Sequence, residues 1–286
     1  MRYGIALPNN QGVARMAQLL ELAVAAEAMQ FDSLWVSEHL FHASYVAQRL
    51  GGRPYHEPLT LLAAVAAQTR QIRLGTSVLV LPWHHPVRLA KTLAAIDDLS
   101  EGRLLVGVGV AQTEDEFANL GVDFHRRGRI ADETLGALKA LWTMDVPEFS
   151  GEHYRFAGLR VEPKPRQKPH PPLLIGGNSA AAIRRLQRYG DGWHPLSLAP
   201  AQIAERSPGI GAQVPIVVRA VTEIAAQPWE RPVAERRTFK GTAAELRAMI
   251  AAYRAAGVTD LVIDANTADI DATLALWRRL REEVLI

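Results

Sequence analysis

The sequence predicts an α/β protein built as a (β/α)8 TIM barrel. Eight short runs of apolar or β-branched residues occur along the 286 residues, and most of them are separated by longer stretches with helical period. This alternation favours parallel strands joined by helical crossovers, and eight repeats favour closure of the sheet into a barrel. An open, doubly wound sheet is the alternative fold with the same alternation.

The first half of the chain contains four strand and helix units. Each strand is a run of apolar residues of strand length, and in each helix apolar residues recur with helical period. Pro86 suits the first turn of a helix, because its missing N–H has no partner there. Strands are expected at 3–7, 33–37, 72–81 and 103–110, and helices at 13–29, 58–69, 86–99 and 130–144.

The second half continues the pattern after one interruption. Strands are expected at 173–175, 192–196, 215–221 and 261–264, and helices at 180–189, 243–256 and 268–283, with Gly257 closing the second of these helices. Between them, FSGEHYRFAGLRVEPKPRQKPHPP predicts a β-hairpin and a Pro-rich return. We expect this insertion, about 145–172, to form a lid or a wall of the site. No boundary is evident elsewhere, so residues 1–286 are expected to form a single domain.

The composition excludes several classes of protein. The 48% of hydrophobic residues can fill a large core, and zero cysteines exclude disulfides, thiolate metal sites and a cysteine nucleophile. The formal net charge is only +2, and acids and bases interleave, so no nucleic-acid partner is expected. No apolar run approaches the roughly 20 residues that span a bilayer, so no membrane contact is expected. The expected location is the cytoplasm.

Two titratable residues follow the second strand. The stretch SLWVSEHL begins as a buried strand and ends with Glu38 and His39. In a barrel, reactive groups lie where the strands end, at the C-terminal face. The ordinary pKa of histidine, near 6.5, suits His39 to proton transfer, although it is as well explained as a hydrogen-bonding partner of a nearby loop. Glu38 can orient a ligand or pair with a base, and alternate residues of a strand face opposite ways.

Small residues mark the exits of the third and fourth strands. Gly75, Thr76 and Ser77 are compatible with a bulge where a planar ligand presses against backbone, but these residues alone favour ordinary strand packing. The stretch GVGVAQ, residues 107–112, is a poor dinucleotide fingerprint, because Gln112 stands at the third glycine position. Its glycines are better explained as clearing space at a strand exit.

The stretch LLIGGNSAAA gives the clearest local signal for a ligand. A strand ends at Gly176 and Gly177, and Asn178 or Ser179 can cap the helix that follows. Backbone N–H groups at the start of a helix bind phosphate, and glycines let a ligand approach the backbone closely. We therefore expect a phosphate site here, with a tight turn that binds no ligand as the alternative.

Adjacent histidines and acids do not predict a metal site. His84 and His85 stand together, as do His56 and Glu57. Metal ligation requires side chains that converge at a suitable spacing, and these pairs do not supply it. We expect no metal.

The chain resembles the bacterial luciferase-like superfamily of flavin and deazaflavin barrels in three stretches, DSLWVSEHL, EPLTLLAAVAAQTRQIRLGTSVLVLPWHHPVRLAKTLAAIDDLSEGRLLVGVGV and PPLLIGGNSAAAIRRLQRYGDGW. Within it, the sequence is most similar to the coenzyme F420-dependent oxidoreductases. The resemblance implies that Glu38 contacts the coenzyme and that His39 lies beside the deazaflavin ring as the proton-transferring residue. It also implies a non-proline cis peptide between Ser77 and Val78, whose bulge supports one face of the ring.

The resemblance assigns further contacts and reveals three departures. Backbone contacts to the coenzyme are implied at Val110 and Ala111, and the phosphate of its tail is implied at Gly176, Gly177, Asn178 and Ser179. Gln112 stands where the sugar-phosphate dehydrogenases of the group carry a glutamate, which disfavours their substrates. Ala111 stands where a glycine is common, and Ala43 where those enzymes use a tryptophan.

These observations predict an F420-dependent oxidoreductase that transfers a hydride between the deazaflavin ring and a small organic substrate. The resemblance implies a homodimer. An FMN-dependent luciferase-like monooxygenase is the first alternative, because FMN shares the outline of ring and phosphate. A flavin- or deazaflavin-binding protein without turnover is the second, since Gln112 replaces an expected acid.

Overall fold

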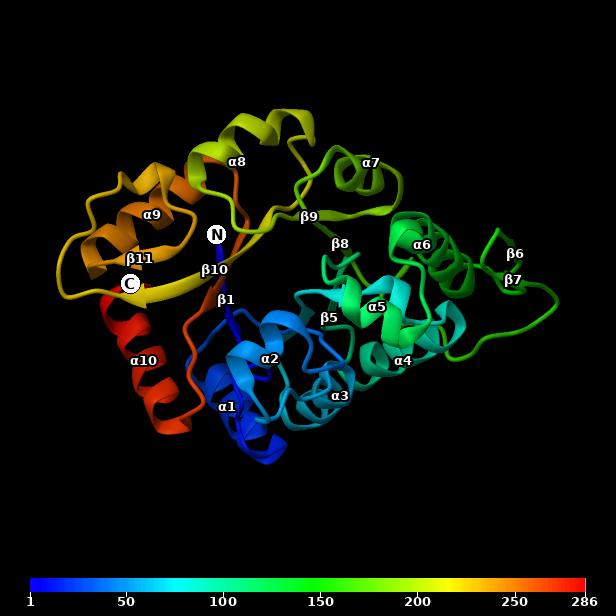
Figure 1. Ribbon diagram of the computed structural model, residues 1–286, viewed down its shortest axis with the longest axis horizontal. Coiled ribbons are helices and arrows are strands. Elements are labelled where there is room, and N and C mark those ends of the chain that lie inside the picture. The colour runs from blue at the N-terminus through cyan, green and yellow to red at the C-terminus, as the bar shows by residue number, and fades with distance from the viewer. Residues whose placement is uncertain (286) are drawn as a thin grey trace.

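The computed structural model describes residues 1–285, in which eight parallel strands form a barrel (Figure 1). The barrel strands are β1 (Arg2–Ala6), β2 (Ser33–Val36), β3 (Arg73–Thr76), β5 (Leu104–Gly109), β8 (Leu173–Gly176), β9 (Gly192–His194), β10 (Val217–Ile224) and β12 (Asp260–Asp264). They pair in the order β10-β12-β1-β2-β3-β5-β8-β9. A parallel bridge between Trp193 and Ile216 returns β9 to β10 and closes the circle. The predicted barrel is confirmed, and the open sheet is excluded.

The long helices lie where the hydrophobic period predicts them, with ends that differ by at most three residues. They are α1 (Met16–Ala28), α3 (Pro58–Gln68), α4 (Pro86–Leu99), α6 (Arg127–Thr143), α7 (Ala180–Tyr189), α9 (Ala243–Ala255) and α10 (Ile270–Glu283). Three helices of seven residues were not predicted, because two turns give too little periodicity: α2 (Ser44–Leu50), α5 (Glu114–Leu120) and α8 (Pro200–Arg206). They follow β2, β5 and β9, so all three lie at the C-terminal face of the barrel.

Smaller elements complete the described chain. Strand β11 (Phe239–Gly241) extends the sheet by pairing with the outer end of β10. Short 3-10 turns are η1 (Leu81–Trp83), η2 (Phe124–Arg126), η3 (Ser207–Gly209) and η4 (Val233–Glu235). In residues 1–285, none of the helices combines the length and the apolar character needed to cross a membrane.

The third barrel strand is broken, so the single strand expected at 72–81 is wrong. Strand β3 ends at Thr76, and β4 (Leu79–Val80) resumes beside the far end of β5. The peptide bond between Ser77 and Val78 is cis, which confirms the geometry implied for this bond. After the kink, β4 pairs with β5. Just before the kink, the hydroxyl of Thr76 donates to the carbonyl oxygen of Gly107, also on β5, at 2.7 Å.

A tryptophan fills the interior of the barrel. Trp35 is fully buried and its Nε1 donates to Ser33 Oγ at 2.9 Å. A Cβ atom added at Gly75 would lie 2.2 Å from the indole, and one added at Gly4 would lie 2.7 Å from it. Bare backbone on the flanking strands therefore makes room for the indole. The remaining members of this inner cluster are apolar: Ala6, Leu105, Leu174, Val217 and Val262. Polar residues beyond this layer lie at the mouth.

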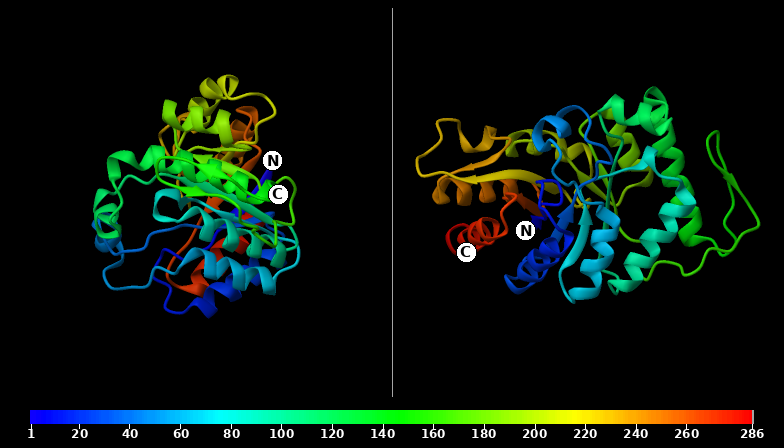
Figure 2. Two further views of the ribbon diagram at one scale, coloured as in Figure 1. Left: turned by 90° about the vertical axis from the view of Figure 1, so that its right-hand side faces the viewer. Right: turned by 60° about the horizontal axis from the view of Figure 1, so that its bottom comes forward.

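The insertion forms the predicted hairpin. Strands β6 (Phe149–Ser150) and β7 (Arg155–Phe156) pair antiparallel beside α6, and Figure 2 shows them at the edge of the molecule. The ring of Tyr154 packs edge-on against His85, at 5.5 Å between centroids. The insertion therefore contacts the connection between β4 and α4, and its role as a lid or wall of the site stays a prediction.

Candidate functional site at the barrel mouth

His39 is held at both ring nitrogens. Its Nδ1 lies 2.7 Å from Oε2 of Glu116, and its Nε2 lies 2.6 Å from the hydroxyl of Tyr45. The side chain of His39 is 16% exposed and that of Glu116 only 1%. The imidazole is therefore partly exposed at the mouth, with a buried acid at Nδ1 and a tyrosine hydroxyl at Nε2.

Glu116 is ionised at neutral pH. Burial is the largest influence on its pKa and raises it, but hydrogen bonds from His39, the Thr113 hydroxyl and the Leu40 amide together hold that pKa below its ordinary value. An ionised carboxylate only accepts hydrogen bonds. Nδ1 of His39 must therefore carry a hydrogen, and Nε2 is the nitrogen that faces the mouth.

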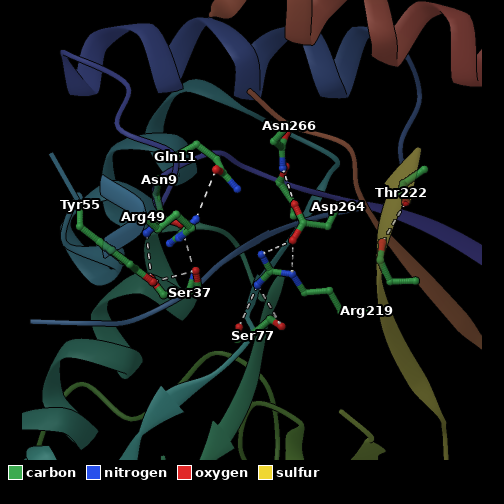
Figure 3. Close-up of polar contacts among 12 residues, drawn as sticks. Asn9, Gln11, Ser37, Arg49, Tyr55, Ser77, Arg219, Thr222, Asp264 and Asn266 are labelled. Carbon is green, nitrogen blue, oxygen red and sulfur yellow. Dashed lines mark hydrogen bonds and ion pairs between the residues drawn. The ribbon is translucent and has the colours of Figure 1, made fainter. Parts of the chain in front are cut away.

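Aromatic rings enclose His39. Tyr45, Tyr55 and Trp83 meet it edge-on, at centroid distances of 5.4, 5.6 and 6.1 Å. The hydroxyl of Tyr55 donates to Ser37 Oγ at 2.9 Å and burial raises its pKa, so it stays protonated (Figure 3). The rings surround the imidazole, and the Tyr45 hydroxyl is the polar group at its Nε2 edge.

Glu38 lies two residues beyond the end of β2 and contacts other residues than His39 does. Its carboxylate accepts from the Val80 amide at 2.7 Å and lies 2.9 Å from Nε2 of His84. Burial is the largest influence on the pKa of His84 and lowers it, but Glu38 outweighs burial and raises that pKa overall. Glu38 is buried and His84 is partly buried, and the pair fixes the chain after the kink. The structure thus gives Glu38 and His39 different partners. Glu38 pairs with a base, His84, which was one of its two expected roles.

Ser77 is held by residues from the opposite wall of the barrel. Nη1 of Arg219, on β10, donates to the Ser77 carbonyl oxygen at 3.0 Å, while its Nη2 donates to Asp264 Oδ2 at 2.7 Å (Figure 3). The Arg219 side chain spans the mouth between β12 and the kink after β3. Its charge is balanced by Asp264.

His194 fixes the hydroxyl of Ser77. Burial lowers the pKa of His194 to about 4, so the ring is neutral. Its Nδ1 lies 2.6 Å from the Val217 carbonyl oxygen, which only accepts, so Nδ1 carries the hydrogen. Nε2 therefore accepts the hydrogen of Ser77 Oγ at 2.8 Å. Ser77 has a defined partner, although it is only partly buried.

Glycines make room for Val78. A Cβ atom at Gly109 would lie 2.7 Å from Val78 Cγ2, and one at Gly176 would lie 3.3 Å from Val78 Cγ1. At Gly107, an added Cβ would lie 1.9 Å from the carbonyl oxygen of Thr76. The prediction that Gly107 and Gly109 clear space at a strand exit is confirmed. Val78 lies partly exposed between two strand ends.

The turn after β8 has the local geometry expected of it. Gly177 has φ +109°, and Ser179 Oγ accepts from the Ala182 amide, so Ser179 is the N-cap of α7. The first amides of a helix have no partner within it, and Ala180 is exposed. Nη1 of Arg206, on α8, donates to the Asn178 carbonyl oxygen at 3.0 Å. The turn therefore combines helix-start amides that have no partner within α7 with a cation that the sequence did not predict.

Asn178 itself is already paired. Its side chain donates to the Leu196 carbonyl oxygen at 2.7 Å and accepts from the Leu196 amide at 2.9 Å. This bidentate contact joins the exits of β8 and β9. Asn178 therefore shapes the turn through its side chain.

The connection after β5 brings an acid to His39. Val110 is partly buried against the core, Ala111 has φ +52°, a conformation that favours glycine, and Gln112 is exposed. The acid that contacts His39 is Glu116, four residues after Gln112. The Thr113–Glu116 spacing matches a helix-capping signature, which predicts a local role and gives no sign of a contact with His39.

The weak histidine pairs have structural roles. His84 bonds Glu38, and Nε2 of His56 lies 2.8 Å from the Val13 carbonyl oxygen. Glu57 caps α3 by accepting from the amides of Leu59 and Thr60.

Comparisons with known proteins agree with this architecture. The sequence model of the luciferase-like monooxygenase family matches residues 1–214. An FMNH2-dependent dimethylsulfone monooxygenase of Pseudomonas putida is 35% identical over 177 residues, 61% of this chain and 47% of that protein. An F420-dependent glucose-6-phosphate dehydrogenase of Amycolatopsis mediterranei is 32% identical over 179 residues, 61% of this chain and 52% of that protein. The crystal structure of monooxygenase RslO1 from Streptomyces bottropensis superposes with a TM-score of 0.84 at 26% identity, covering 100% of this chain and 99% of the other.

Proposed function

Because the chain belongs to the luciferase-like monooxygenase family, we propose that it is an F420-dependent oxidoreductase that transfers a hydride between the deazaflavin ring and a small organic substrate. The observation that carries this proposal is the pair formed by His39 and the ionised Glu116 at the barrel mouth. Hydride transfer to or from a neutral substrate requires an accompanying proton, and a histidine backed by a carboxylate is suited to carry it.

The residues at the mouth fit a planar ring with a phosphorylated tail. Val78 offers an apolar, partly exposed surface beside the cis peptide, in a gap that Gly109 and Gly176 keep open. The start of α7 after Ser179 offers amides without a partner inside the helix, near Arg206, which suits a phosphate; the Gly177 amide itself donates to the His194 carbonyl oxygen. When bound, the deazaflavin ring would supply or accept the hydride.

The residues of the chain would transfer the proton and hold the backbone around the kink in place. His39 exchanges the proton through Nε2, and Glu116 fixes the tautomer and stabilises the imidazolium. Arg219 and His194 hold the carbonyl and hydroxyl of Ser77. Glu38 holds Val80, so the kink is fixed on both sides.

A titration of the apoprotein with F420 and with FMN, followed by fluorescence, tests the coenzyme. We expect micromolar binding of F420 and at least about tenfold weaker binding of FMN, a difference of about 1.4 kcal/mol. His39→Ala should retain F420 binding and lose hydride transfer. Tighter binding of FMN than of F420 would overturn the proposed coenzyme.

An FMN-dependent monooxygenase is the second candidate. It is supported by the 26% identity to a monooxygenase over the whole chain and by the 35% identity to an FMNH2-dependent monooxygenase. Oxygen uptake with supplied reduced FMN, and none of the expected hydride exchange with F420, would favour it. A flavin- or deazaflavin-binding protein without turnover stays an alternative, but the contact of Glu116 with His39 weakens the argument for it from Gln112.

A further inference from the structure

The hydroxyl of Tyr45 occupies the reactive edge of His39. Tyr45 lies in the first turn of α2, and its oxygen is 2.6 Å from Nε2. We propose that Tyr45 is a catalytic residue that passes the proton between His39 and the substrate. This inference rests on the proposed function and assigns the last donor of its proton path.

The other nitrogen of His39 cannot serve this purpose. Nδ1 donates to Glu116, which is 1% exposed and accepts two further hydrogen bonds, from Thr113 and Leu40. A proton that leaves the imidazole for the mouth must therefore leave from Nε2. Tyr45 lies on that path.

A tyrosine hydroxyl can serve both protonation states of its neighbour. It donates to Nε2 when the imidazole is neutral and accepts from Nε2–H when the imidazole is charged. Burial raises the pKa of Tyr45 and outweighs the opposing charges of Arg49 and Arg219, so the phenol keeps its hydrogen at neutral pH. Tyr45 is nevertheless 48% exposed, so a substrate has access to it.

The proton account is simple. Reduction of a substrate would need one proton in addition to the hydride, with its two electrons, that a bound reduced deazaflavin would supply. The O–H hydrogen of Tyr45 moves to the substrate, and the hydrogen on Nε2 of the imidazolium moves to the Tyr45 oxygen. Tyr45 ends as a phenol, and His39 ends neutral with its hydrogen on Nδ1 beside Glu116. Oxidation of the substrate runs the same steps in reverse.

A second tyrosine provides a matched control. The ring of Tyr55 also meets His39 edge-on, at 5.6 Å against 5.4 Å for Tyr45, but its hydroxyl donates to Ser37. Tyr45→Phe and Tyr55→Phe each remove one hydroxyl beside the same imidazole. Only the first removes a partner of Nε2.

The contact is tested without any coenzyme. Nitrogen-15 NMR of the histidine side chains at pH 8 reports the tautomer and the hydrogen bonding of each ring nitrogen. We expect Tyr45→Phe to shift the Nε2 resonance of His39 and to leave its Nδ1 resonance in place, whereas Tyr55→Phe should leave both in place. An Nε2 resonance that Tyr45→Phe does not move would overturn the contact and the relay with it.

The relay itself is tested by single-turnover hydride transfer from reduced F420, with menadione and 2-cyclohexen-1-one as acceptors, in mixtures of H2O and D2O. Two protons that move together give a curved dependence of rate on deuterium fraction. We expect that curve in the wild type and in Tyr55→Phe, and a straight line in Tyr45→Phe with a rate about 100-fold lower and F420 binding unchanged. An unchanged rate in Tyr45→Phe would overturn the relay alone. Absence of transfer by the wild type with both acceptors would overturn the proposed function and the relay together.

Discussion

Glu116 and His39 are 77 positions apart in the chain, yet Oε2 of the first lies 2.7 Å from Nδ1 of the second. The connection after β5 folds into α5, whose first turn directs the carboxylate toward the exit of β2. The contact fixes the tautomer of His39, because Nδ1 must carry a hydrogen to donate to the carboxylate. It also places an acid beside His39, although Gln112 is not one.

Replacing this carboxylate by an amide tests its role. Glu116→Gln keeps the shape of the side chain but removes the negative charge that stabilises the imidazolium. We expect hydride transfer to fall roughly 100-fold, since a positioned acid or base contributes about 10²–10⁴-fold. Binding of F420 should not change. Glu114→Gln, on the exposed side of the same helix, is the control; an equal loss there would show that the effect is general to α5.

Buried His194 should make the fold sensitive to mild acid. Its folded pKa of about 4 lies below the ordinary value of 6.5, so between these values the unfolded chain binds a proton that the folded chain does not. Stability is therefore full above pH 6.5 and falls as the pH drops toward 4, by about 3 kcal/mol in all.

Urea unfolding at pH 7 and pH 5 measures this loss. His194→Gln cannot titrate, so the difference in unfolding free energy between the two pH values should be smaller in this variant than in the wild type. His84 has a raised pKa and acts with the opposite sign, since its contribution is lost as the pH rises. His84→Gln should therefore steepen the loss in acid, and an equal loss in the wild type and in His194→Gln would contradict the assignment.

A methyl group at Gly75 should disrupt the barrel interior. The added Cβ would lie 2.2 Å from the Trp35 ring, which is fully buried and cannot move aside. We expect Gly75→Ala to lower the unfolding free energy by about 3 kcal/mol or more, at the upper end of overpacking costs. At Gly209, nothing lies within 4 Å of an added Cβ, so Gly209→Ala should change stability by less than about 0.5 kcal/mol. Thermal unfolding of both variants gives the comparison.

Arg206 should matter only for a ligand that carries phosphate. Its guanidinium lies at the turn that precedes α7, beside Asn178. We expect Arg206→Gln to weaken F420 binding about three- to tenfold, because a charge-assisted hydrogen bond at an exposed position is lost. Binding of the phosphate-free deazaflavin riboside should not change. Arg188→Gln, an exposed arginine at the other end of α7, controls for net charge, and equal weakening of both ligands by Arg206→Gln would place the phosphate elsewhere.

The sequence by itself determined the strands, the long helices and the ends of the strands where chemistry is expected. Hydrophobic period is a local property, so it reports burial wherever an element is long enough to show it. It places His39 at a strand exit and the Gly176–Ser179 turn before a helix. The sequence also shows glycines at 107 and 109. The hydrophobic period does not show the kink after β3 that these glycines accommodate.

Only the tertiary structure decided which side chains meet at the mouth. The partners of His39 are Tyr45 and Glu116, which lie on seven-residue helices too short to show a period. Arg219 reaches Ser77 across 142 positions. Such contacts depend on how the loops pack after the barrel closes, because the barrel brings the ends of distant strands to one face. Local residue patterns do not indicate which strand ends become neighbours, so only the folded structure identifies the polar partners.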